Sequence, residues 1–133
     1  MLLKDIKNIL KCKVLTNRSQ LNEEIKYCFA ADLMSDVLRY ARTGSLLLTG
    51  LTNVQVLQVA EILDLKGILF VRGKVPENEV IEQASKRELP LLSTNELMFD
   101  SCAILFNQGL KGGRSKLTDK DEAKNTVPTV VQN

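Results

Sequence analysis

Apolar residues follow two different spacings along the chain. From Asp32 onward, stretches with helical spacing alternate with short runs that are apolar at every position. This pattern predicts helices over 32–41, 53–63, 77–88 and 96–107, separated by strands over 45–49, 67–71 and 90–93. Continuous apolar strands are typical of a sheet buried on both faces. The pattern therefore predicts a three-layer α/β/α fold, with a mainly parallel sheet of about five strands covered by helices on both faces.

The two ends of the chain differ from this alternating region. Apolar residues within 2–10 recur at helical spacing, and "KCKVLT" and "IKYCFAA" predict short strands, so the chain opens α-β-β. Gly109 suits the C-cap of the last helix, and the glycines of Lys111–Gly113 interrupt regular structure. We expect one α/β domain over residues 1–110 and a disordered polar tail over residues 111–133.

Charge limits the partners that this chain can bind. The formal net charge is +2, but residues 1–110 hold 13 basic and 13 acidic side chains, so the excess lies in the last 23 residues. The tail alternates in sign, which is typical of a solvated segment. The chain has no Trp and only six Phe and Tyr residues. These features disfavour nucleic acid, which needs a basic stripe and, for single strands, aromatic platforms.

The cysteines and the N-terminal residues predict the compartment. The three cysteines are far apart and form no C-x-x-C pair, so neither a disulfide framework nor a zinc site is expected. Lys4 and Asp5 interrupt the first apolar residues, and no apolar run approaches the length that spans a membrane. We expect a soluble cytoplasmic protein that contacts no membrane.

Polar residues follow three of the predicted parallel strands at the point where each strand ends. In open α/β sheets ligands bind at this edge, beside helix N-termini whose free N–H groups favour anions. A small anionic ligand such as a nucleotide or phosphate is the type that these loops suit. The candidate ligand-binding residues are Thr49, Gly50, Asn53, Arg72, Lys74, Ser93 and Thr94.

A structural interpretation competes with ligand binding in each loop. Asn53 or Thr52 suits the N-cap of the following helix and Gly50 suits a sharp turn, so capping is favoured there. No known phosphate-binding glycine motif is present. Arg72 and Lys74 fit a solvated loop as well as they fit an anion site. Residues 93–95 and Asp32 also suit helix N-caps.

Catalytic groups are scarce in this sequence. With no His there is no imidazole base, no Ser–His or Cys–His nucleophile pair and no His metal ligand. The cysteines lie in apolar contexts, where a buried inert thiol is the usual role. We expect no catalytic residues, no metal and no cofactor. The alternative is a small enzyme or phosphotransfer component that uses Asp32 or Asp36.

Two predicted helices are more apolar than burial of one face requires. They span residues 53–63 and 96–107, and each has only a narrow set of polar positions. A helix that is apolar nearly all round lies deep in a core or at an interface. These helices favour an interface, and together with the family resemblance described next they predict a homodimer, with a different protein partner as the alternative.

Three segments together resemble the DRTGG domain family. They are "ADLMSDVL", "TGSLLLTGLTN" and "GILFVRGK", and the resemblance covers residues 1–110. The motif that names the family is reduced here to Arg42–Thr43–Gly44. The resemblance implies an α/β/α domain similar to the N-terminal domain of bacterial HPr kinase/phosphorylase. It also implies a regulatory or scaffolding module that self-associates and has no catalytic activity of its own.

Overall fold

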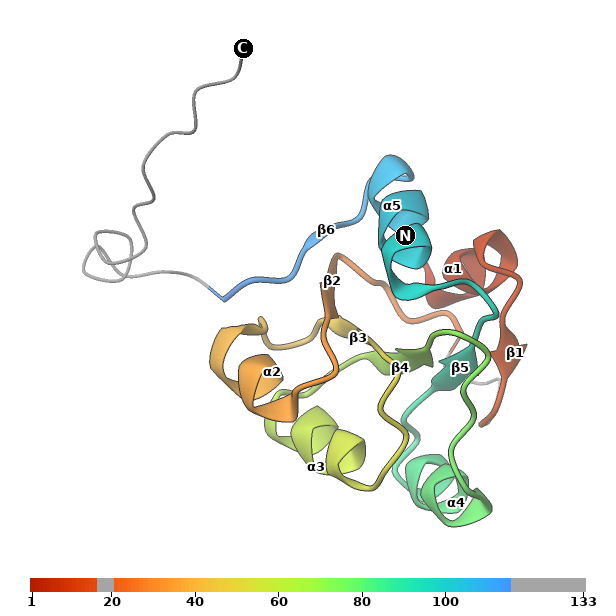
Figure 1. The fold of residues 1–133 in the computed structure, drawn as a ribbon, viewed down its shortest axis with the longest axis vertical. Coiled ribbons are helices and arrows are strands. Elements are labelled where there is room, and N and C mark those ends of the chain that lie inside the picture. The colour runs from red at the N-terminus through yellow and green to blue at the C-terminus, as the bar shows by residue number, and fades with distance from the viewer. Residues whose placement is uncertain (17–20, 116–133) are drawn as a thin grey trace, which may run out of the picture.

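The computed structural model describes residues 1–16 and 21–115 (Figure 1). Every helix and strand expected between Asp32 and Asn107 is present, and its ends shift by two residues at most. The elements are α1 (Leu3–Ile9), β1 (Lys13–Val14), β2 (Tyr27–Ala30), α2 (Met34–Tyr40), β3 (Leu46–Thr49), α3 (Gln55–Ile62), β4 (Gly67–Phe70), α4 (Asn78–Lys86), β5 (Leu91–Ser93), α5 (Met98–Asn107) and β6 (Lys111–Gly112).

The described strands form one six-stranded sheet in the order β1-β5-β4-β3-β2-β6. Strands β2, β3, β4 and β5 run parallel to one another, and β6 runs parallel to β2. The short β1 lies antiparallel to β5. The predicted mainly parallel three-layer fold is therefore confirmed. The sheet has one strand more than the sequence pattern predicted.

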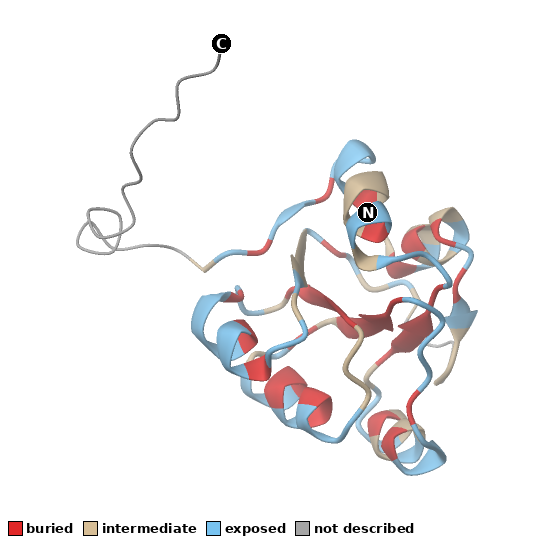
Figure 2. Cartoon of the chain, in the orientation of Figure 1, coloured by how far each residue is buried: buried red, intermediate tan, exposed pale blue. Residues whose placement is uncertain are grey.

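Each face of the sheet has its own hydrophobic core. Leu47 and Phe70 pack on one side with buried residues of α2, α3 and α4, whereas Leu48 and Leu69 pack on the other side with α1 and α5. Successive strand residues point to opposite faces, so a sheet covered on both sides buries every position. All residues of β3 and β4 are buried, as Figure 2 shows.

The two unusually apolar helices lie in different surroundings. Val56, Leu57 and Val59 of α3 are buried in the core that α2 and α4 share, so packing within one chain accounts for most of its apolar residues, although Ile62 at its end is exposed. In α5, by contrast, Phe99 is 81% exposed and Phe106 is 71% exposed. Of these two described helices, only α5 has large aromatic side chains exposed to water.

The last described segment differs from the prediction. Regular structure was expected to end at Leu110, but β6 pairs with β2, and the N–H of Gly113 donates to the carbonyl of Cys28 at 2.6 Å. A Cβ at Gly113 would lie 3.0 Å from that carbonyl oxygen, so the close approach needs glycine. These glycines, which were expected to interrupt regular structure, instead let the chain join the sheet edge. The predicted disordered tail from residue 116 onward lies outside the described residues.

Candidate functional site

Three predicted loops leave the same edge of the sheet. Because β3, β4 and β5 are parallel neighbours, their carboxyl ends lie side by side. Thr49 is the last residue of β3, Ser93 is the last of β5, and Arg72 comes two residues after β4. The topology therefore gathers the candidate residues at one edge, although their side chains play different roles there.

The guanidinium group of Arg72 lies against Gly50. A Cβ at Gly50 would overlap Nη2 of Arg72 and lie 3.1 Å from Cζ. The Arg72 side chain thus reaches from the loop after β4 to the loop after β3, and only glycine leaves it this space. The group that approaches Gly50 in the folded chain is thus the side chain of Arg72.

The backbone of the same loop is bonded to the loop after β5. Arg72 and Gly73 donate their N–H groups to the carbonyls of Glu96 and Thr94, each at 2.8 Å. Both donors have left-handed backbones, with φ of +60° at Arg72 and +68° at Gly73. This conformation is unfavourable for a residue such as Arg72, so the surrounding bonds must hold it in place. No local sequence signal predicted it.

Three candidate hydroxyl groups are already used inside the protein. Thr49 donates to Oδ1 of Asp32 at 3.2 Å, Ser93 donates to the carbonyl of Lys74 at 2.8 Å, and Thr94 donates to the carbonyl of Leu10 at 2.8 Å. All three side chains are buried. These hydroxyl groups hold the loops in place, so a ligand at this edge would have to bind to other groups.

Asn53 is not the N-cap residue of α3, which is Val54, but its side chain bonds to the first residue of that helix. Its Oδ1 accepts the N–H of Gln55 at 3.0 Å, and Val54 between them is already in the helical conformation. The backbone N–H groups of Thr52, Asn53 and Val54 find no acceptor among the described residues. Such free donors at the start of a helix are the groups that an anion can use.

Asp32 does not cap α2, contrary to the prediction. The N-cap residue is Leu33 and α2 has no side-chain cap. Oδ1 of Asp32 instead accepts the N–H of Gly50 at 2.7 Å, in addition to the Thr49 hydroxyl. An acidic residue before a helix can bond to a neighbouring strand end as well as to its own helix, and only the folded sheet decides between them.

The catalytic alternative required Asp32 and Asp36 to face one pocket together with Arg72. Asp36 lies in the first turn of α2 and lines a hollow with Phe29, Tyr40 and Arg114. Arg72 does not line that hollow. Asp32 does not line it either, so Asp36 shares this hollow with neither the other acid nor the cation.

The charges at this edge are favourable for an anion. Arg72 and Lys74 are exposed, and neither has a carboxylate of the described chain within 4.0 Å. Asp32 and Glu96 are acidic residues close by; one oxygen of Asp32 is occupied by the two hydrogen bonds from the β3 loop, and the backbone carbonyl of Glu96 accepts the N–H of Arg72. Two cations without a close carboxylate can provide charge-assisted hydrogen bonds to phosphate or carboxylate oxygens.

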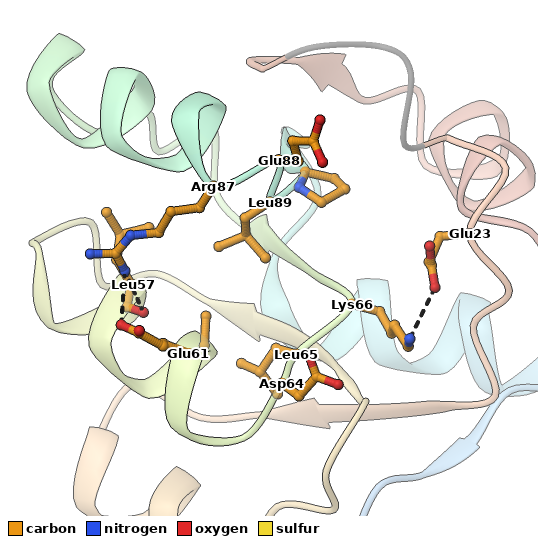
Figure 3. A pocket seen from close by; sticks show the side chains of 11 residues that line it. Glu23, Leu57, Glu61, Asp64, Leu65, Lys66, Arg87, Glu88 and Leu89 are labelled. Carbon is orange, nitrogen blue, oxygen red and sulfur yellow. Dashed lines mark hydrogen bonds and ion pairs between the residues drawn. The ribbon is translucent and has the colours of Figure 1, made fainter.

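A pocket at the opposite edge has the reverse character (Figure 3). It has a volume of about 380 Å³ and holds four carboxylates but only two cations. Arg87 is held by Glu61 at 3.5 Å and by the carbonyl of Leu57 at 3.4 Å, and Lys66 lies 3.0 Å from Glu23. The bond to Glu23 raises the pKa of Lys66. The C-terminal ends of α3 and α4 also lie here, so this pocket disfavours anions.

The residues that remain of the family's name motif have a structural role. Arg42 stacks on the Tyr27 ring at 4.4 Å from the centroid, and its N–H donates to the carbonyl of Gly113 at 2.6 Å. Its carbonyl accepts the Ser45 hydroxyl at 2.7 Å. This turn precedes β3, so it lies at the edge away from the candidate site and holds the segment after β6.

The three thiols are poor nucleophiles. Burial raises the pKa of Cys12 to about 12 and that of Cys28 to about 12, and burial also raises the pKa of Cys102. A thiol with so high a pKa carries little thiolate near neutral pH. Over residues 1–16 and 21–115 no group of three or more acidic, Cys or His side chains is placed to bind a metal ion. None of the described helices has the length and apolar character needed to cross a membrane.

Comparison with known proteins agrees with this architecture. The chain is similar to the crystal structure of the CBS and DRTGG domains from the regulatory region of Clostridium perfringens pyrophosphatase, complexed with the activator diadenosine tetraphosphate. The TM-score is 0.65 at 17% identity, over 77% of this chain and 45% of that one, so this chain spans less than half of that structure. A search of curated proteins found no match.

The family comparison covers most of the chain. The DRTGG domain matches residues 5–107, from α1 through the whole of α5. All three loops of the candidate site fall inside this range. The chain therefore belongs to the DRTGG domain family.

Proposed function

We propose that this protein is a non-catalytic regulatory or scaffolding domain that binds a small anionic ligand, such as a nucleotide or phosphate, at the carboxyl edge of its sheet. The observation that carries the proposal is the Arg72 guanidinium group lying against Gly50, with Lys74 in the same loop and no described carboxylate paired with either cation. A built contact of this kind holds a cation at the edge where α/β folds receive ligands.

The free backbone donors make this edge more selective for anions. The N–H groups of Thr52, Asn53 and Val54 lie at the start of α3, in the loop that also contains Gly50. Together with Arg72 they provide donors from two neighbouring loops, which suits the several oxygens of a phosphate group. The similar pyrophosphatase region is described with diadenosine tetraphosphate, which is an anionic nucleotide, and that supports the class of ligand proposed here.

Calorimetric titration with a panel of mononucleotides, diadenosine tetraphosphate and pyrophosphate tests this proposal. Arg72→Ala removes one charged hydrogen-bond partner and should weaken binding about tenfold to a hundredfold. Arg87→Ala is the matched control, because Arg87 is an exposed cation at the opposite edge of the sheet. The proposal is wrong if Arg72→Ala leaves the affinity for every bound ligand unchanged.

The same experiments bear on the catalytic alternative. Asp32→Asn keeps an oxygen that can accept the Gly50 and Thr49 hydrogen bonds but removes the negative charge. Under the non-catalytic proposal this variant binds anions at least as tightly as the parent chain, because a nearby negative charge is lost. Turnover of a phosphoester or acyl phosphate that Asp32→Asn abolishes would contradict the proposal.

Self-association is the second part of the proposed function. It is supported by the exposed aromatic side chains of α5, which the described chain does not cover. Light scattering at micromolar protein concentration should give twice the mass of one chain. A monomeric mass would contradict this part without affecting the ligand proposal.

A further inference from the structure

Helix α5 carries apolar side chains that the core of its own chain covers only in part. Phe99 is 81% exposed and Phe106 is 71% exposed, while Cys102 and Ala103 between them are only partly buried. Cys102, Ala103 and Phe106 follow Phe99 by three, four and seven residues, and this spacing places the four side chains along one side of the helix. We call Phe99, Cys102, Ala103 and Phe106 the α5 stripe.

The α5 stripe borders an apolar groove. The groove has a volume of about 350 Å³ and lies between α5 and the strands β2 and β6, at the side of the sheet where β6 lies in Figure 1. Cys28 and Ala30 of β2 and Leu110 line its wall and floor, and Lys111 is its single charged lining residue. An apolar groove beside exposed aromatic side chains is typical of a protein interface.

The order of residues in the α5 stripe is symmetric about its centre. Phe99 and Phe106 lie at equal distances in sequence from the midpoint between Cys102 and Ala103. A two-fold rotation about that midpoint, perpendicular to the helix, exchanges the two ends of the stripe. A two-fold interface requires such self-complementarity, because the same surface must serve on both copies. The small residues at the centre let two helices approach closely.

We infer that a second copy of this chain occupies the groove, with the two α5 helices antiparallel across a two-fold axis near Cys102 and Ala103. Phe99 of each copy then packs beside the partner subunit's Phe106. This inference rests on the self-association proposed above and names its surface. Asp100 is the single charged residue of α5, and it lies outside the stripe, so the arrangement brings no like charges to its centre.

The exposed area is consistent with a stable dimer. A Phe side chain can bury about 150–250 Å², so the exposed fractions leave about 300 Å² of Phe surface in water on each copy. Two copies would bury about 600 Å² from these side chains alone, a large share of the roughly 1,600 Å² of a standard interface. The groove walls and the ends of α5 provide further contact.

Charged substitutions in the full-length chain test the surface. Phe106→Glu places a charge in the centre of the contact and should raise the dimer dissociation constant at least about a hundredfold. Ile62→Glu is the matched control, because Ile62 is a similarly exposed apolar residue, 67% exposed, on α3. Sedimentation analysis of both variants gives the dissociation constants, and circular dichroism shows that both remain folded.

A pair of double variants tests the antiparallel arrangement. With Phe99→Lys and Phe106→Glu combined, opposite charges face each other across the axis, whereas Phe99→Glu with Phe106→Glu sets like charges together. The first double variant should dimerise at least about tenfold more tightly than the second. Equal affinities would overturn the arrangement.

The possible outcomes separate this inference from the proposed function. A dimer that Phe106→Glu leaves intact and Ile62→Glu breaks would overturn the α5 surface while self-association stands. A wild-type chain that is monomeric at micromolar concentration would overturn both, and the groove would then belong to another occupant. The ligand proposal is tested separately by titration of Arg72→Ala, because Arg72 and Gly50 lie in loops outside the α5 surface.

Discussion

At the scale of single residues, Gly50 shows how the smallest side chain shapes the candidate site. Its N–H is held by Asp32 at 2.7 Å, and its Cα faces the guanidinium group of Arg72. The residue thus meets an acid on one side and a base on the other, with no ion pair within 4.0 Å between them. Glycine at this position keeps the cation close to the β3 loop.

Gly50→Ala should separate the position of Arg72 from the stability of the fold. The atoms that a Cβ would meet are the far end of a flexible side chain, which can swing away into solvent. We therefore expect the free energy of unfolding to change by no more than about 1 kcal/mol. The affinity for the anionic ligand should fall as it does for Arg72→Ala.

Urea denaturation and calorimetry on the same samples check this expectation. An unchanged affinity in Gly50→Ala would mean that the guanidinium group acts from elsewhere, or does not act. A large loss of stability would mean that the Arg72 contact supports the loop itself.

Roles at this scale could be predicted only where the partner is local in sequence. A bond from Asn53 to the start of α3 could be anticipated, because its acceptor serves an N–H two residues away, although the N-cap itself is Val54. The roles of Asp32 and Thr94 were not, because their partners lie 18 and 84 residues away in sequence. Polar residues before a helix suit a cap equally well in all three cases, so the sequence pattern does not distinguish them.

At the scale of elements, β6 is the strand that the sequence pattern did not predict. It is two residues long and includes one of two consecutive glycines, so it has neither the length nor the side chains that mark a strand. The longer apolar runs of β3 and β4 were predicted to within one residue. Burial on both faces leaves a clear signal in the sequence, whereas a short exposed edge strand leaves almost none.

The two glycines of this segment provide a matched pair for testing β6. A Cβ at Gly113 would lie 3.0 Å from the carbonyl oxygen of Cys28, whereas a Cβ at Gly112 would meet nothing within 4 Å. Gly113→Ala should therefore lower the free energy of unfolding by about 1–3 kcal/mol, as overpacking against backbone does. Gly112→Ala should change it by less than about 1 kcal/mol.

Chemical denaturation of the two variants gives both values. Equal effects would show that β6 does not approach β2 as closely as the structure places it. Proteolysis after Lys111 offers an independent readout, since a detached segment is cut faster.

At the scale of the whole molecule, the layer architecture follows from the sequence more directly than the site does. Alternating helices and doubly buried strands specify a parallel sheet between two helical layers, and this predicts that the three loops share one edge. The direction in which each loop runs does not follow from the sequence pattern. It depends on contacts between loops, such as Arg72 against Gly50, which no single segment encodes.

Two backbone hydrogen bonds connect the proposed ligand-binding edge of the sheet to helix α5, which carries the proposed dimer surface. The N–H groups of Arg72 and Gly73 donate to the carbonyls of Glu96 and Thr94, respectively, in the segment that leads directly into α5. The loop that carries the cation and the helix that carries the exposed Phe residues are thus joined by backbone hydrogen bonds. A ligand that orders or shifts this loop changes the start of α5 as well.

Thermodynamic reciprocity turns this connection into a measurable quantity. If ligand binding changes the dimer dissociation constant by some factor, dimer formation must change the ligand affinity by the same factor. We expect that factor to be at least about fivefold, within the usual range of coupling between sites. Titrations well below and well above the dimer dissociation constant would measure it, and equal affinities would show that the two events are independent. With coupling, the domain converts the concentration of a small anion into a change of assembly.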